Sequence, residues 1–285
     1  MTTKTERMLP LYEAKMIHQF DHRWATFDGA ESRDVSESEK ENAEFEVLGR
    51  YWVAEERVEK ALEGRGDNAW LIGWRNIARS TDERTTIATS LPRVAVGHSM
   101  PLVLGSKSLV LTANLTSFAS DYVARQKVGG TNFTFGYFQQ LAVLPPEIFE
   151  KSLLPGPATS EWLRPRLLEL HYTANDIKEL AASNGKLGAP FKWDPERRKS
   201  LRCEVDALFF HLYGIARGDV DYIMDTFPIV KRKDEAAFGE FRTKRLILEA
   251  YDSMQAAIHT GISFESTLNP PPGQGPRHSA KETLA

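Results

Sequence analysis

The chain has 285 residues, of which 41% are hydrophobic and 26% are charged, and its formal net charge at pH 7 is −3. This length suggests one or two domains with a substantial core, and the composition is that of an ordinary soluble globular protein. The negative net charge excludes a uniformly basic coat for nucleic acid. Charge is unevenly spread, however: segment 31–63 holds eleven acids against five bases, whereas 64–130 holds eight bases against four acids. The basic middle is compatible with a polyanionic partner.

The single cysteine, Cys203, excludes an intrachain disulfide and fits a reducing cytosol. Because it stands beside Leu201 and Val205 in a helical pattern, we expect a structural thiol rather than a nucleophile. No secretory signal follows Met1, and no apolar run approaches the roughly 20 residues that cross a bilayer. We therefore expect a cytoplasmic protein without a membrane partner.

The chain opens with an expected extended segment and acidic loop, residues 1–45. A strand is expected over 45–53, followed by a helix over 54–62, where Val58 and Leu62 share one face. Glycines then interrupt the pattern, which indicates a break in the chain.

Residues 46–150 are expected to form a β-rich domain, because short apolar runs separated by turn residues fill 70–111. An amphipathic helix is expected next, since apolar residues recur at steps of four, three and four. These residues are Leu111, Leu115, Phe118 and Tyr122. A loop-like block, 125–132, is expected at the C-terminal end of this helix.

After a proline-rich joint the pattern becomes helical, and residues 158–262 are expected to form a helical domain. Thr173 and Asp176 resemble a capping box, and Asp194 followed by proline predicts the start of a long helix. The proline- and glycine-rich tail, 266–285, is expected to be disordered. The whole chain is therefore expected to be α+β, a β-rich part followed by a helical one.

The block 125–132 combines two cations, two amides and paired glycines. Glycine lets the backbone approach a ligand closely, arginine and lysine suit phosphate, and glutamine and asparagine can read base edges. The block therefore indicates contact with nucleic acid.

A catalytic or metal centre is not visible in the sequence. His18 and His22 stand four apart, but the zinc-protease pattern needs a glutamate where Gln19 and Asp21 stand, so we expect structural roles and no metal. Segment 269–272 is superficially similar to the tetrapeptide of amino-methylating DNA methyltransferases, but its fourth residue is proline, which cannot stack on a flipped base. No strand leads into a Gly-x-Gly turn that would seat S-adenosylmethionine.

A second basic cluster, 231–233, lies before a helix with further cations. It fits either a solvated helix face, compensated by Asp234 and Glu235, or a surface that contacts phosphate. Both interpretations stay open at this point.

Four further blocks occur in order along the chain: Leu11–Arg23, Ala78–Thr85, Asp121–Thr131 and Asp225–Val230. Together they resemble the C-terminal part of large adenine-specific DNA methyltransferases of restriction–modification and phage-defence systems, the fused type IIG-like group. The similarity spans roughly residues 9–258, and the order of the blocks makes it specific. In that family this region follows the catalytic domain and is a target-recognition domain, which lies against DNA while the catalytic domain flips and methylates an adenine.

The resemblance implies double-stranded DNA as the partner and seven residues that contact it. These are Arg79, Arg84, Arg125, Gln126, Lys127, Thr131 and Asn132. The family's S-adenosylmethionine and catalytic motifs lie upstream of this region. We therefore expect no cofactor and no catalytic residue here, and a methylase catalytic domain or subunit as a second partner.

Several versions of this function fit the sequence. The chain is expected to be a separate specificity subunit, the product of a truncated gene, or a piece of a longer protein. One alternative is a catalytically active S-adenosylmethionine-dependent methyltransferase or restriction enzyme subunit. Another is a non-catalytic subunit that docks a protein through its helical half.

Overall fold

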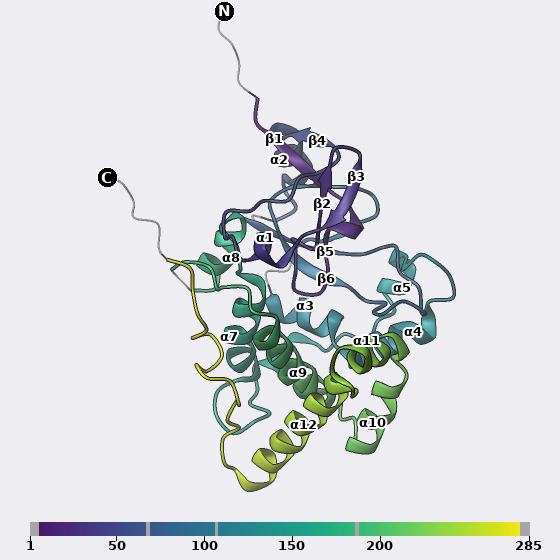
Figure 1. Ribbon diagram of the computed structural model, residues 1–285, viewed down its shortest axis with the longest axis vertical. Helices are drawn as coiled ribbons and strands as arrows, with labels where there is room; N and C mark the ends of the chain where they lie inside the picture. Colours follow the sequence, from purple (N-terminus) through teal and green to yellow (C-terminus); the bar gives the residue numbers. More distant parts are fainter. Residues whose placement is uncertain (1–5, 67–68, 106–107, 186–187, 280–285) are drawn as a thin grey trace, which may run out of the picture.

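The computed structural model describes residues 6–66, 69–105, 108–185 and 188–279. Small sheets dominate the first part of these segments, and helices dominate the second part (Figure 1). The chain is therefore α+β, which confirms the fold class expected from the sequence.

The strands are short, and they form two three-stranded sheets and one hairpin within the described residues. They are β1 (Met8–Tyr12), β2 (Ala25–Asp28), β3 (Glu31–Asp34), β4 (Trp52–Ala54), β5 (Trp70–Trp74), β6 (Ala88–Pro92), β7 (Ala95–Val96) and β8 (Leu102–Val103). β1 lies between β4, which is antiparallel, and β7, which is parallel. β5 lies between β6 and β8, both antiparallel, and its five residues are all buried.

The strand expected over 45–53 is wrong for most of its length, because only β4 at its end is a strand. The segment does not pair along one neighbouring strand, because Leu48 contacts β2 and Gly49 lies against β1. Leu48 accepts a hydrogen bond from the Phe27 amide, at 3.0 Å, and donates one from its own amide to the Thr26 hydroxyl. At Gly49 an added Cβ would lie 2.9 Å from the Leu11 amide nitrogen, so the close approach of the two backbones requires glycine.

The helices of the first half are short. They are α1 (Glu37–Lys40), α2 (Glu55–Leu62), α3 (Leu109–Thr116), α4 (Phe118–Lys127), α5 (Phe135–Phe138) and α6 (Pro146–Phe149), with a 3-10 turn at Ala14–Met16. The single helix expected through Leu111–Tyr122 is divided at Ser117. Ser117 caps α4 through its side chain, and the Asp206 carboxylate accepts a hydrogen bond from the Phe118 amide at 2.8 Å. These two groups satisfy the donors of a new helix start.

The helices of the second half are longer and pack together. They are α7 (Thr159–His171), α8 (Lys178–Ser183), α9 (Pro195–Leu212), α10 (Arg217–Asp225), α11 (Pro228–Phe238) and α12 (Arg242–Thr260), with a 3-10 turn at Asn175–Ile177. α9 begins as expected, because the Asp194 carboxylate accepts hydrogen bonds from two amides of its first turn. The capping box expected at Thr173 and Asp176 is wrong. The Asp176 carboxylate contacts the His22 imidazole at 3.0 Å instead.

The largest hydrophobic core joins the two halves of the chain. Phe20, Trp70 and Ile72 belong to the same buried cluster as Leu163 of α7 and Leu208 of α9. Residues from both sides of the expected boundary near 150–158 therefore share one core. Two smaller clusters lie around β1 and around Trp74.

The C-terminal segment, expected to be disordered, is held against α7 and α9 as far as residue 279. Arg197 donates hydrogen bonds to the carbonyls of Pro270 and Pro271, and Glu169 accepts one from the Gly273 amide at 2.7 Å. The Lys192 amide donates to the Pro276 carbonyl at 2.8 Å. The proline- and glycine-rich composition predicted disorder, but it could not show that residues distant in sequence hold the segment in place. Across the described ranges, no helix combines the length and the apolar character that crossing a membrane requires.

Candidate nucleic-acid interface

The loop between β5 and β6 carries two of the candidate cations, Arg79 and Arg84, and Arg84 is buried. Its guanidinium donates to Asp121 at 2.6 Å and to Gln19 at 3.2 Å, and it stacks on the Phe118 ring with a centroid distance of 3.8 Å. It also donates to the Thr116 carbonyl. A guanidinium with these partners cannot reach a phosphate on the surface, so Arg84 is a structural residue.

Arg125, at the end of α4, is used in a similar way. It donates hydrogen bonds to the backbone carbonyls of Asp82 and Glu83, at 2.5 and 2.7 Å, and contacts Asp121 at 3.4 Å. Its guanidinium lies 4.2 Å from the centre of the Phe227 ring. Arg125 therefore fixes the main chain of the loop that carries Arg79.

The other five candidates reach the surface. Arg79, Gln126, Thr131 and Asn132 are exposed, and Lys127 is partly exposed. An added Cβ on Gly129 or Gly130 would meet no atom within 4 Å, so these glycines face open space.

Two loops distant in sequence lie side by side at this surface. Ile77 and Asn132 form an antiparallel bridge, and the Phe133 amide donates to the Asn76 carbonyl at 2.6 Å. Asp82 closes a tight turn by accepting a hydrogen bond from the Arg79 amide at 2.9 Å. The structure therefore brings the Arg79 loop and the 129–132 loop into one ridge, which we call the paired loops (residues 76–83 and 129–135).

The sequence reasoning missed two apolar residues on the paired loops. Ile77 is 56% exposed and Phe135 is 60% exposed, although both are large hydrophobic side chains. Phe135 packs edge-on against Trp74, with ring centroids 5.8 Å apart. Isolated exposed apolar residues carry little meaning, but here they flank amide and cationic side chains that suit base edges and phosphates.

A tight turn at His18–Asp21 forms a second feature beside the β5–β6 loop. Phe20 has φ of 58°, a left-handed conformation that is strained for a bulky residue. The Phe20 carbonyl accepts a hydrogen bond from buried Arg198 of α9 at 3.0 Å, and its ring packs edge-on against His171. Surrounding structure therefore holds the turn in a fixed shape.

The two histidines of this turn region do not share a helix face. His18 stacks on Trp24 with a centroid distance of 4.4 Å, whereas His22 contacts Asp176. In the part of the chain that the structure describes, no group of three or more His, Cys, Asp or Glu side chains is placed to hold a metal ion. Cys203 is buried, and burial raises the pKa of its thiol to about 12, as suits a structural thiol.

The cluster 231–233 lies within α11, and it precedes the cation-bearing helix expected from the sequence, α12. Lys233 forms an ion pair with Glu83 of the β5–β6 loop, and Arg232 is exposed. Lys233 therefore links α11 to the loop that carries Arg79.

No family model, no curated protein and no solved structure matches this chain.

Proposed function

We propose that this chain is a sequence-recognition module for double-stranded DNA, belonging to a restriction–modification or phage-defence system that methylates adenine at N6. The observation that carries the proposal is the pair of adjacent loops. They present Arg79 and the amide side chain of Asn132, and Gln126 and Lys127 stand at the end of α4, just before the second loop.

Contacts within the protein hold the paired loops in place, as recognition of bases requires. Arg84 and Arg125 are buried or half-buried cations whose donors hold the loops and α4 in place. A site that reads bases needs side chains fixed in position, because a bidentate contact tolerates little displacement. The resemblance of the ordered sequence blocks to target-recognition regions supports the same assignment.

In this proposal the chain performs no chemistry. A methylase catalytic domain or subunit would bind S-adenosylmethionine, flip the adenine and transfer the methyl group. The proposed location is the cytoplasm, where such systems meet DNA.

Duplex binding measured by fluorescence anisotropy at several salt concentrations tests the proposal. A pool of labelled duplexes of random sequence serves as the first probe, and the bound fraction is selected and sequenced. We expect affinity to fall steeply with salt, because each phosphate contact releases counterions. Arg79→Gln should reduce the slope of log affinity against log salt by about 1.

Asn132→Ala should have a different effect from Arg79→Gln. It should relax the sequence preference at one position, at a cost of about 1–3 kcal/mol for the selected site. Arg57→Gln is the matched control, because Arg57 is exposed on α2, outside the paired loops. If the folded protein binds no duplex even at low salt, the stand-alone recognition role is wrong.

A second candidate function, a non-catalytic subunit that docks a protein, is favoured by a different observation. Met8, Leu48, Tyr51 and Trp52 are exposed large hydrophobic residues near β1 and β4, where Pro10 and Trp52 are directly paired. The docking surface was expected on the helical half, where Tyr222 and Phe238 are exposed large hydrophobic residues as well. Trp52→Ser distinguishes the two roles. It should leave duplex binding unchanged, and it should weaken association with a methylase subunit if the patch is the docking face.

A further inference from the structure

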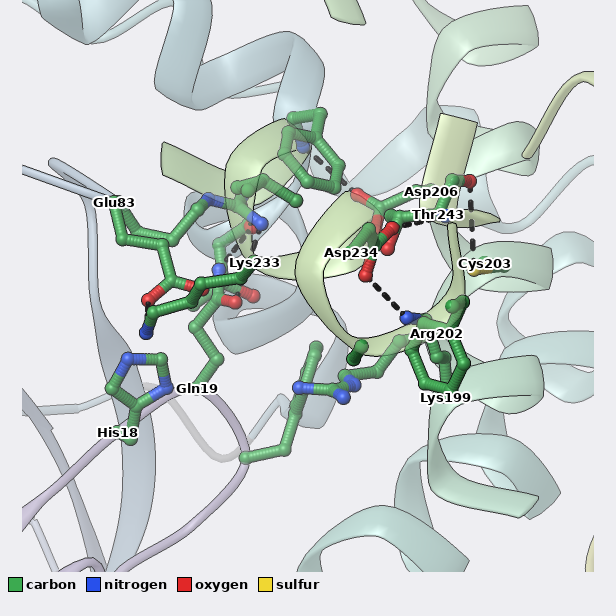
Figure 2. Close-up of a pocket in the computed structure, with 17 residues that line it drawn as sticks. His18, Gln19, Glu83, Lys199, Arg202, Cys203, Asp206, Lys233, Asp234 and Thr243 are labelled. Carbon is green, nitrogen blue, oxygen red and sulfur yellow. Dashed lines mark hydrogen bonds and ion pairs between the residues drawn. The ribbon is translucent and has the colours of Figure 1, made fainter. Parts of the chain in front are cut away.

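Two adjoining cavities lie between the His18–Asp21 turn and α9, the larger bordered also by α11 and the smaller by α1. Their volumes are about 290 and about 280 Å³, and both are lined by His18, Gln19 and Arg202. Figure 2 shows His18 and Gln19 on one side of the larger cavity and Lys199, Arg202 and Cys203 of α9 on the other. Because the cavities share these residues, we describe them together as the α9 groove.

Most charged side chains of the α9 groove have partners within the protein. Lys199 pairs with Asp234 at 2.7 Å, and Lys233 pairs with Glu83. Lys40 and Arg198, which line the smaller cavity, contact Asp21 and backbone carbonyls respectively. Arg84 is likewise engaged by Asp121.

Arg202 differs from these cations. Among the described residues it has neither a hydrogen bond nor an ion pair, although it is half-buried and lines both cavities. A guanidinium has five donors in a planar fork, which matches the oxygens of a phosphate. Its donors are therefore available to a ligand in the groove.

His18 adds a second available group. Its ring stacks on Trp24, and no side-chain hydrogen bond to it is found in the described part of the chain. Burial and the charges of Arg75 and Arg202 lower the pKa of His18 well below its ordinary value, so the ring is neutral at pH 7. A neutral imidazole offers one N–H donor.

The acidic groups that line the larger cavity are each engaged within the protein. Glu83 and Asp234 are paired with a lysine each, and Asp206 accepts a hydrogen bond from the Phe118 amide. Asp34 and Glu37 line the smaller cavity, so an anion is better placed in the larger one. Burial raises the pKa of Asp206 to about 6, so its negative charge is lost only as pH falls below that value.

An apolar wall completes the larger cavity. Phe20, Phe118 and Phe238 line it together with the polar groups. Phe238 is 45% exposed, whereas Phe20 and Phe118 are buried and Arg84 already stacks on the Phe118 ring, so Phe238 is the ring available to a ligand. A small inorganic anion would leave this wall uncovered, whereas an organic phosphate with an aromatic ring would cover it. These features together describe a site for a nucleotide.

We propose that the α9 groove binds one nucleotide unit, with its phosphate on Arg202 and His18 and its base against the phenylalanine wall. The unit has two possible sources, a free mononucleotide or one nucleotide of a DNA strand. The proposal does not require duplex recognition by the paired loops, because a free mononucleotide tests it without any duplex.

Isothermal titration calorimetry of the full chain with dAMP, inorganic phosphate and a twelve-nucleotide single strand tests the proposal. We expect dAMP or the strand to bind the wild type, and Arg202→Gln to weaken that binding about tenfold or more. Arg57→Gln makes the same charge change on exposed α2 and should leave binding unchanged. His18→Phe retains the stacking on Trp24, removes the donor, and should weaken binding less than Arg202→Gln.

The outcomes separate the two sources of the nucleotide. Arg202-dependent binding of dAMP supports a free nucleotide, and Arg202-dependent binding of the strand alone supports a nucleotide of DNA. The proposal is overturned if neither probe binds, or if both bind equally to wild type and Arg202→Gln. Far-UV circular dichroism verifies the fold, and Arg202→Lys replaces Arg202→Gln if the latter is unfolded.

Discussion

Replacing Arg84 by methionine should lower the free energy of unfolding by about 3–5 kcal/mol, the range for breaking a buried ion pair. The Asp121 side chain is 0% exposed and would lose a partner at 2.6 Å. Its remaining contacts are the Thr85 amide at 3.1 Å and a longer one to Arg125 at 3.4 Å. Gln19 and the Thr116 carbonyl would also lose a donor.

Urea unfolding followed by tryptophan fluorescence measures this loss. A double variant, Arg84→Met with Asp121→Leu, should be more stable than the sum of the single effects by about 2 kcal/mol, because it removes the unpaired charge. Arg57→Met is the control, and it should change the free energy of unfolding by less than about 0.5 kcal/mol. A stable Arg84→Met variant that binds duplex poorly would refute the structural role and restore Arg84 as a DNA contact.

Three further predictions concern the helical half. Because burial raises the pKa of Asp206 to about 6, its ionised form costs stability as pH rises through that value. At pH 8 the free energy of unfolding of Asp206→Asn, measured by urea unfolding, should therefore exceed that of the wild type by up to about 3 kcal/mol. The gain should be lost near pH 4, and a pH-independent difference would contradict this. Burial lowers the pKa of His171 to about 3, so the unfolded chain takes up the proton first and stability should fall below about pH 6.5. His171→Gln should make that fall shallower by up to about 1.4 kcal/mol per pH unit, and an unchanged slope would count against the burial of the ring. Arg197→Met should release the 266–279 segment and speed its cleavage by trypsin, whereas equal cleavage of variant and wild type would show that the segment is held by other contacts.

Local signals in the sequence were sufficient for several elements. The helix start at Asp194 needs only its own side chain and the two amides that follow, and the apolar run of β5 suits a fully buried strand. The division of the helix at Ser117 could not be predicted in the same way. One of its stabilising groups is Asp206, which is 88 residues away in the chain.

The candidate site was only partly predictable, because its contacts, like that of Asp206, join residues that are distant in sequence. Sequence identifies a cation, but only tertiary packing decides whether its charge faces solvent or a buried carboxylate. One signal was available for Arg125, since Asp121 stands four residues before it on the same helix face. Nothing in the sequence set Arg202 apart from the other arginines. It differs from them only because no described residue pairs with it in the folded chain, and that depends on residues distant in sequence.

On the proposed function, in which the paired loops contact DNA, the arrangement of Arg84 and Arg125 has a consequence for how the chain could change its target. Arg84 anchors the β5–β6 loop through Asp121, and Arg125 holds it through the backbone carbonyls of residues 82 and 83. Because every residue type has a backbone carbonyl, the Arg125 contacts do not depend on which side chains the loop carries. Side chains at the tips of the paired loops are therefore free to be exchanged without loss of the support beneath them. We expect diversification of specificity to proceed by replacement of the loop tips, with the arginine–aspartate framework retained, and the same positions are the ones to randomise when the module is to be retargeted.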